Sequence, residues 1–275
     1  MPAAALHRWV VVALMLAAGL PAAAQSGPGP AAESASVERY ERTVPLRAGS
    51  SFSLSNINGS ISVEGWNRDE AQIIAVKSSS RGLEEFGQVG IVIRQLPEGI
   101  SVETRYLRDG GAEVSVDYHV RVPLPVRLSM VSTVNGSVTV RNVTGSGTLV
   151  AINGNVNLFR AAGFFSARAT NGNIGLELLS LDAGGAADAG RPAAAPPGIS
   201  VQTVNGSIVV ALPQDASAEV DARTQHGEFS SEIPLLAETS TSGRAARGRV
   251  GAGGPALVLR TVNGSIRLRI AGALV

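Results

Sequence analysis

A short phrase centred on Asn-Gly recurs along the chain and constrains its fold more than any other feature. The copies are LSNINGSISV at 54–63, VSTVNGSVTV at 131–140, LVAINGNVNL at 149–158, ARATNGNIGL at 167–176, VQTVNGSIVV at 201–210 and LRTVNGSIRL at 259–268. The anchor asparagines of the second, third and fourth copies follow one another at intervals of 18 residues. Self-similarity of this kind predicts one structural unit per copy, with each unit packed against its neighbours.

Two stretches separate the later copies. Residues 182–198 are rich in Ala, Gly and Pro, and residues 238–254 are rich in small residues. Such composition buries too little apolar surface to offset the entropy of ordering, so we expect both stretches to be flexible insertions. Between them lies a degenerate copy, ARTQHGEFSS at 222–231, which has His226 where the other copies have asparagine.

Side-chain alternation within each copy predicts two strands joined by a bend. In the fifth copy Val201, Thr203 and Asn205 share one face before the bend, and Ile208 and Val210 share one after it. A period of two on both sides of a glycine is typical of two strands. Asn-Gly suits the bend because both residues tolerate positive φ.

Two architectures are compatible with this pattern. Independent hairpins would form a meander or a β-sandwich, whereas a coil that returns about every 18 residues would stack the anchors at ~4.8 Å. The constant turn favours the coil, because stacked asparagine amides can hydrogen-bond along a ladder. We therefore predict an all-β fold, a β-solenoid of Asn-Gly rungs, with a β-sandwich as the alternative. The predicted ladder consists of Asn58, Gly59, Asn135, Gly136, Asn153, Gly154, Asn171, Gly172, Asn205, Gly206, Asn263 and Gly264.

The stretch before the second copy lacks the phrase but is still strand-like. Val114, Val116, Tyr118 and Val120 alternate with polar residues, which is typical of an antiparallel strand with one buried and one solvated face. We expect residues 38–130 to form an antiparallel β meander with the first repeat, capping a solenoid at 131–275. Residues 38–275 would then be a single domain.

The N-terminus has the pattern of a secretory signal. A basic start at His7 and Arg8 precedes an apolar run at 9–20 and the small residues 22–24. The run is shorter than the ~20 residues of a membrane-spanning helix. We expect a signal peptide at 1–24, a flexible linker at 25–37 and an exported protein that has no transmembrane segment after cleavage. Its location would be the periplasm, the cell surface or the medium.

Composition excludes several classes of partner and site. The chain has no cysteine, so it forms no disulfides and no thiolate metal sites. Its 23 Lys and Arg residues balance 22 Asp and Glu residues, for a net charge of +1. This balance gives no electrostatic case for nucleic acid as a partner.

The best cluster of ionisable residues comprises Glu219, Asp221, His226 and Glu228. Paired carboxylates could act as acid and base on a sugar or bind calcium, and the same alternation is also that of a solvated strand face. No catalytic constellation is complete, so we expect no enzyme, no cofactor and no metal site. A polysaccharide-cleaving β-helical enzyme that uses Glu219, Asp221 and Glu228 is the alternative function.

The residue before each anchor asparagine is aliphatic in all copies but one, which has Thr170. By alternation it points away from the threonine and asparagine side chains. The column could therefore be the core, could be covered by a neighbouring layer, or could be an exposed surface for a partner. Its aliphatic members are Ile57, Val134, Ile152, Val204 and Val262.

The phrase T-V-N-G-S, as at 133–137 and 261–265 of this cysteine-free chain, resembles the bacterial "putative adhesin" β-strand-repeat family, a domain of unknown function. The resemblance covers roughly residues 37–275. It implies a repetitive β fold at the cell envelope without known catalytic residues. On this basis we expect a module for adhesion, binding or scaffolding. Its partners would be an envelope protein or a cell-wall or surface glycan, with self-association left open.

Overall fold

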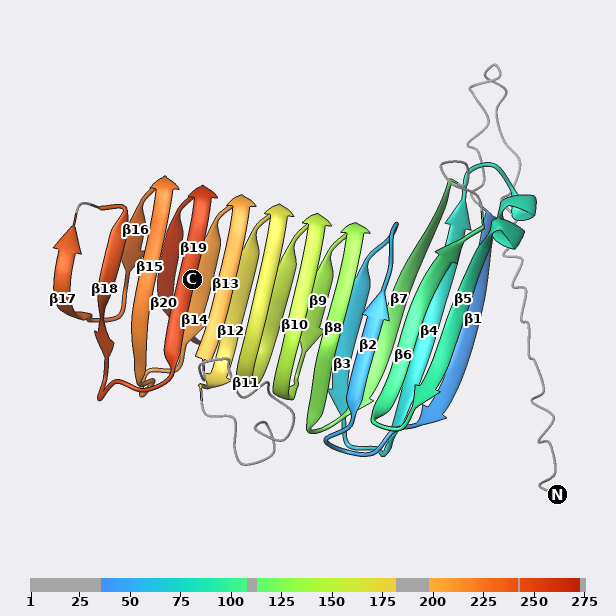
Figure 1. Ribbon diagram of the computed structural model, residues 1–275, viewed down its shortest axis with the longest axis horizontal. Coiled ribbons are helices and arrows are strands. Elements are labelled where there is room, and N and C mark those ends of the chain that lie inside the picture. Colours follow the sequence, from blue (N-terminus) through green and yellow to red (C-terminus); the bar gives the residue numbers. More distant parts are fainter. Residues whose placement is uncertain (1–35, 108–112, 182–197, 242, 273–275) are drawn as a thin grey trace, which may run out of the picture.

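The computed structural model describes residues 36–107, 113–181, 198–241 and 243–272 of the chain. Strands β1 to β20 belong to one sheet, which curls so that two rows of strands face each other across an apolar core (Figure 1). The predicted all-β class is confirmed. The expected signal segment at 1–24, the linker up to residue 35 and residues 182–197 lie outside the described residues.

The strands that lead into the Asn-Gly turns form the approach row. Parallel pairing joins its strands from β6 to β15, and antiparallel pairing adds β5 at one end and β18 and β17 at the other. In spatial order the row contains β5 (Val89–Leu96), β6 (Gly99–Tyr106), β2 (Ser51–Ser55), β8 (Val126–Asn135), β10 (Thr144–Asn153), the second half of β11 (Val156–Asn171), β13 (Gly198–Asn205), β19 (Ala256–Asn263), β15 (Ala218–His226), β18 (Ala245–Val250) and β17 (Leu236–Thr241).

The strands that leave the turns form the return row. Its pairing is parallel from β7 to β16, and β4 and β1 extend it by antiparallel pairing. The spatial order is β1 (Ser36–Pro45), β4 (Glu70–Ser79), β7 (Val114–Pro123), β3 (Ile61–Trp66), β9 (Val138–Arg141), the first half of β11, β12 (Ile174–Ser180), β14 (Ile208–Leu212), β20 (Ile266–Ile270) and β16 (Phe229–Ser231). A short 3-10 helix, η1 (Leu83–Gln88), lies between β4 and β5 in the chain. No helix in the described part of the chain is long and apolar enough to span a bilayer.

The copies do not all stack in the order of the chain. The anchor of the first copy, Asn58, bridges to Asn135 of the second, 77 residues later. The last copy lies between two earlier ones, since β19 pairs with both β13 and β15. Asn263 is therefore in register with Asn205 on one side and with His226 on the other, and the degenerate copy becomes the end of the row of anchors.

The N-terminal part differs from the expected meander. Antiparallel pairs are present, but the neighbours β1, β4 and β7 are not consecutive in the chain. In addition, β6 and β7 pair in parallel with β2 and β3, so they extend both rows without carrying the Asn-Gly phrase. The expected alternation in β7 is confirmed, because Val114, Val116, Tyr118 and Val120 are all buried.

The expectation of a flexible insertion at 238–254 is wrong. This segment includes most of β17 and all of β18. β18 pairs antiparallel with β15 from Ala218↔Val250 to Arg223↔Ala245. β18 thus covers the edge of β15 at which another Asn-Gly copy would otherwise pair. The last strand of a stacked sheet needs such a cover, because its edge would otherwise leave backbone groups unpaired.

The face that carries the threonines is buried. Thr203 and Thr261, two residues before their anchors, are each 4% exposed. Each hydroxyl donates to the glycine carbonyl of a neighbouring copy, Thr203 Oγ1 to Gly172 O and Thr261 Oγ1 to Gly206 O, both at 2.9 Å. A buried hydroxyl needs such a partner, so these bonds make threonine compatible with the core.

Thr261→Val is expected to lower the free energy of unfolding by about 1–2 kcal/mol, because the shape is kept while the Gly206 carbonyl loses its donor. Thr139→Val is the control, since Thr139 is only half-buried in β9. Urea melts of both variants measure the difference. Equal midpoints would mean that the buried hydroxyl bonds contribute nothing.

The glycine of each turn is required by the close approach of two backbones. A Cβ added at Gly172 would lie 2.0 Å from the carbonyl oxygen of Gly154, and one at Gly206 would lie 2.0 Å from that of Gly172. The expectation that the anchor asparagines adopt positive φ is wrong, because in the described residues only Asn142 and Arg160 do so among non-glycines. Stacking therefore explains the asparagine of each pair, whereas the glycine serves both the close approach and the turn, since Gly59, Gly136, Gly154 and Gly264 have positive φ.

Two side-chain ladders hold the turns in register. In the first, each anchor amide donates from Nδ2 to the Oδ1 of the adjacent anchor: Asn135 to Asn58 (2.8 Å), Asn153 to Asn135 (2.9 Å), Asn171 to Asn153 (2.9 Å), Asn205 to Asn171 (2.8 Å) and Asn263 to Asn205 (2.8 Å). In the second, the residue two positions after the anchor accepts from the backbone N–H of its neighbour, as in Asn173 N to Asn155 Oδ1 at 2.8 Å. Each of the three residues of the Asn-Gly-Ser/Asn triplet thus contacts the adjacent copy.

Candidate functional site

The aliphatic residues before the anchors lie on the outward face of the approach row. Ile57, Ile152 and Val204 are 40%, 41% and 42% exposed, and Val134 and Val262 are half-buried. These five residues are the aliphatic column. The interpretation that they form the core is wrong, because alternation turns the opposite, threonine-bearing face into the core.

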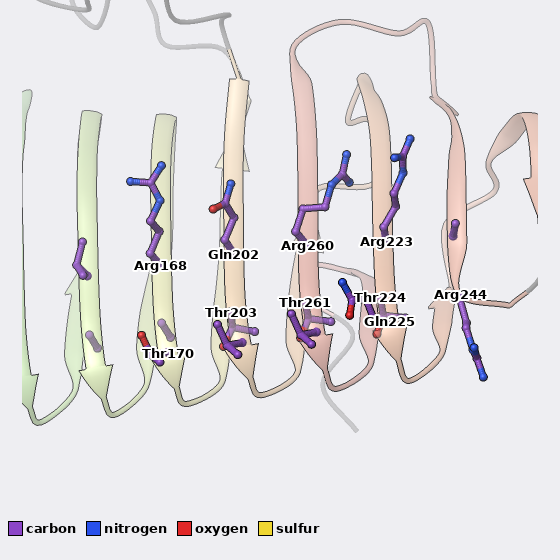
Figure 2. Close-up of a pocket in the computed structure, with 16 residues that line it drawn as sticks. Arg168, Thr170, Gln202, Thr203, Arg223, Thr224, Gln225, Arg244, Arg260 and Thr261 are labelled. Carbon is purple, nitrogen blue, oxygen red and sulfur yellow. The ribbon is translucent and has the colours of Figure 1, made fainter.

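A groove with a volume of 770 Å³ opens on the outward face of the approach row, over its C-terminal strands. Thr170, Val204 and Val262 form its apolar side, so the groove shares two members with the aliphatic column. Its polar side chains come from the adjacent strands β11, β13, β19 and β15, with Arg244 at the border of β18 (Figure 2). Its polar side chains are those of Arg168, Gln202, Arg223, Gln225, Arg244 and Arg260. Thr203, Thr224 and Thr261 border the groove, but their hydroxyls donate to glycine carbonyls on the core side.

The arginines of the groove were missed by sequence reasoning. Arg168, Gln202, Arg260 and Arg223 each stand three residues before an anchor or before His226. A comparison of the copies at this one position contains the signal, but Arg223 and Arg260 become neighbours only because β19 stacks against β15. No acidic residue lines the groove among the described residues.

Two of these arginines, Arg260 and Arg223, form ion pairs with Asp221. Arg260 donates from Nη2 to its Oδ2 at 2.6 Å and from Nη1 to its carbonyl oxygen at 2.7 Å, and Arg223 Nε lies 3.4 Å from Oδ1. Partial burial alone would raise the pKa of Asp221. The hydrogen bond and charge of Arg260, aided by Arg223 and Arg247, outweigh this effect and lower the pKa. Asp221 is therefore an ionised counter-ion that positions Arg260.

The structure does not bring the three predicted carboxylates together. Glu219 and Asp221 lie on β15, and Glu228 follows the turn beyond its far end. The seven residue-to-residue steps from Glu219 to His226 span roughly 23 Å of extended strand, whereas the two carboxyls of a glycosidase lie roughly 5–10 Å apart. Asp221, held ionised by Arg260, is unsuited to act as a general acid.

The other predicted candidates are solvated. His226 is exposed at the turn. Among the described residues no group of three or more His, Asp or Glu side chains lies close enough to hold a metal ion. The geometry of this cluster is that of a strand surface.

A scan against protein-family models and a search of curated proteins found no match. Solved structures that are similar include a putative cell adhesion protein from Clostridium sporogenes, with 9% identity and a TM-score of 0.43, which covers 84% of this chain and 99% of that one.

Two further structures are a putative adhesin from Bacteroides fragilis, with a TM-score of 0.31, and a putative adhesin from Parabacteroides distasonis, with a TM-score of 0.24. Each is 9% identical and covers 84% of this chain and 96% of its own.

Proposed function

We propose that the chain is an exported, non-enzymatic binding module of the cell envelope, whose stacked Asn-Gly rungs form a β-solenoid. Its partner, an envelope protein or a surface glycan, lies along the outward face of the approach row. The signal-type N-terminus supports export. The absence of a converged acid and base among the described carboxylates supports binding over catalysis.

The aliphatic column is the observation that carries this proposal. Contiguous exposed apolar surface on a soluble protein usually marks an interaction site. The column exposes two-fifths of Ile57, Ile152 and Val204, although the residue directly before each of them (Asn56, Ala151 or Thr203) is buried. The ladders on both sides of each glycine hold the column in line, so a partner would bind a rigid surface with little ordering cost.

Replacing Ile57 and Ile152 with threonine is expected to weaken binding to an envelope fraction about thirtyfold, because two apolar contacts of about 1 kcal/mol each are lost. Threonine is compatible with this position, since Thr170 occupies it in another copy. Cosedimentation with separated membrane and cell-wall fractions gives the affinity and the class of partner.

The control replaces Val37 and Leu179, apolar residues of return-row strands that are 58% and 52% exposed, with threonine. These changes should leave binding within about twofold. Equal losses in the two double variants, or no binding to either fraction, would contradict the proposed binding surface.

The same proposal predicts that purified protein releases no reducing sugar from envelope glycans. Release that disappears in Glu219→Gln would establish the polysaccharide-cleaving alternative. Glu219 is exposed and is the best placed of the three carboxylates to lose its charge without disturbing Arg260. Colorimetric detection of reducing ends over time is the measurement.

A further inference from the structure

Three of the four arginines of the groove lie in one line with Gln202 across four strands. Parallel pairing sets Arg168 opposite Gln202, Gln202 opposite Arg260, and Arg260 opposite Arg223. Neighbouring strands lie ~4.8 Å apart, so the line spans roughly 14 Å. In Figure 2 these four side chains extend from their strands on the same side of the row of threonines.

Positive charge in the groove exceeds the negative charge that could balance it. The lining contains four arginines and no acidic residue. Asp221, beside the groove, is paired with Arg260 and Arg223. Among the side chains that the structure describes, no carboxylate pairs with Arg168 or Arg244. The whole chain has a net charge of only +1. The excess of positive charge is therefore a local property of the groove and does not extend over the whole surface.

The chemistry of the lining fits a charged sugar polymer. Guanidinium groups bind carboxylates in a planar, bidentate way. The amide of Gln202, which lies between Arg168 and Arg260, can donate to or accept from a hydroxyl. Thr170, Val204 and Val262 offer an adjacent apolar strip against which the C–H face of a sugar ring can pack.

We propose that this groove binds an acidic polysaccharide, with uronate carboxylates on Arg168 and Arg223 and hydroxyls on Gln202. A repeating ligand suits this line better than a single small anion, because the donors repeat along it at the strand spacing. A planar membrane suits it less, because the donors line a concave groove. This inference rests on the proposed binding role and names its ligand class.

The test uses two polymers with one backbone, polygalacturonate and its fully methyl-esterified form, which lacks the charge. Titration calorimetry of the purified protein should show binding of polygalacturonate that weakens with salt and much weaker binding of the ester. Arg168→Gln combined with Arg223→Gln should lower the association constant about tenfold or more. This variant keeps the Arg260–Asp221 pair.

Arg141→Gln combined with Arg267→Gln is the matched control. It removes the same charge from exposed positions on the return row and should leave affinity within about twofold. Urea midpoints close to that of the unmodified protein would show that both variants fold. Equal losses in the two variants, equal binding of the ester, or no binding of polygalacturonate would overturn the proposal.

Phosphatidylglycerol vesicles form the second arm. Arginine-dependent binding to vesicles without binding to polygalacturonate would assign the groove to a lipid surface and overturn the choice of glycan. Ile57 and Ile152 do not line the groove. If polygalacturonate did not bind but the threonine variants still lost envelope binding, the acidic-polysaccharide inference would fail and the binding role would stand. The two failures can therefore be told apart.

Discussion

Gly172→Ala is expected to lower the free energy of unfolding by about 3 kcal/mol or more. The added Cβ would lie 2.0 Å from the carbonyl oxygen of Gly154, and 2.5 Å from its carbonyl carbon. Both atoms belong to the backbone of the adjacent copy, so no side chain can rotate away. The two turns would have to separate, which would also stretch the ladder bond between Asn171 and Asn153.

Gly90→Ala is the control for this variant. A Cβ at Gly90, in β5, meets no atom within 4 Å, so alanine should change stability by less than about 1 kcal/mol. Urea melts that follow the far-ultraviolet circular dichroism of the strands give both values. If the two midpoints shift by the same amount, the close approach of the turn backbones is contradicted.

Asn153→Ala is expected to cost about 2 kcal/mol, because it removes two hydrogen bonds of about 1 kcal/mol each. Asn153 donates to Asn135 and accepts from Asn171, both at 2.9 Å. The cost is limited by exposure of the turn, where water can reach the groups that lose a partner.

Asn263→Ala tests the same ladder near its end. Asn263 donates to Asn205 at 2.8 Å, and on its other side the register places His226 rather than an asparagine. This variant should therefore cost about half as much as Asn153→Ala. Equal shifts in the urea midpoint would mean that the amides do not act as a ladder, and that each turn is stabilised separately.

Local features of the repeat could be predicted because they depend on neighbours in the chain. The alternation of Val201, Thr203, Ile208 and Val210 identified two strands and the bend between them, and all four side chains are buried. The same alternation turned Val204 to the opposite face. Whether that face was core or surface stayed open, because period-two patterning separates two faces without telling which one meets another layer.

The segment at 238–254 shows where composition misleads. Its small residues predicted a flexible insertion, but β18 gains backbone hydrogen bonds from the free edge of β15. Those bonds need no large side chain, because the donors and acceptors are in the main chain. A strand that caps an edge can therefore have a composition that indicates a loop.

The arginine-lined groove could not be predicted as a unit. Arg168, Arg223 and Arg260 are spread over more than ninety positions of the printed sequence, and each alone is an ordinary solvated arginine. Their alignment depends on which copies are neighbours. The insertion of β19 between β13 and β15 is what sets Arg260 beside both Gln202 and Arg223.

The sequence by itself determined the class of fold, the position of each turn and the residues of the asparagine ladder, because these follow from short-range alternation and from the repeated triplet. Only the tertiary structure decided the order of the copies, the identity of the outward face and the line of arginines. The physical reason is that parallel strand pairing uses main-chain groups that every copy shares. Any two copies could pair equally well locally, and the choice among them is made by the packing of the whole sheet.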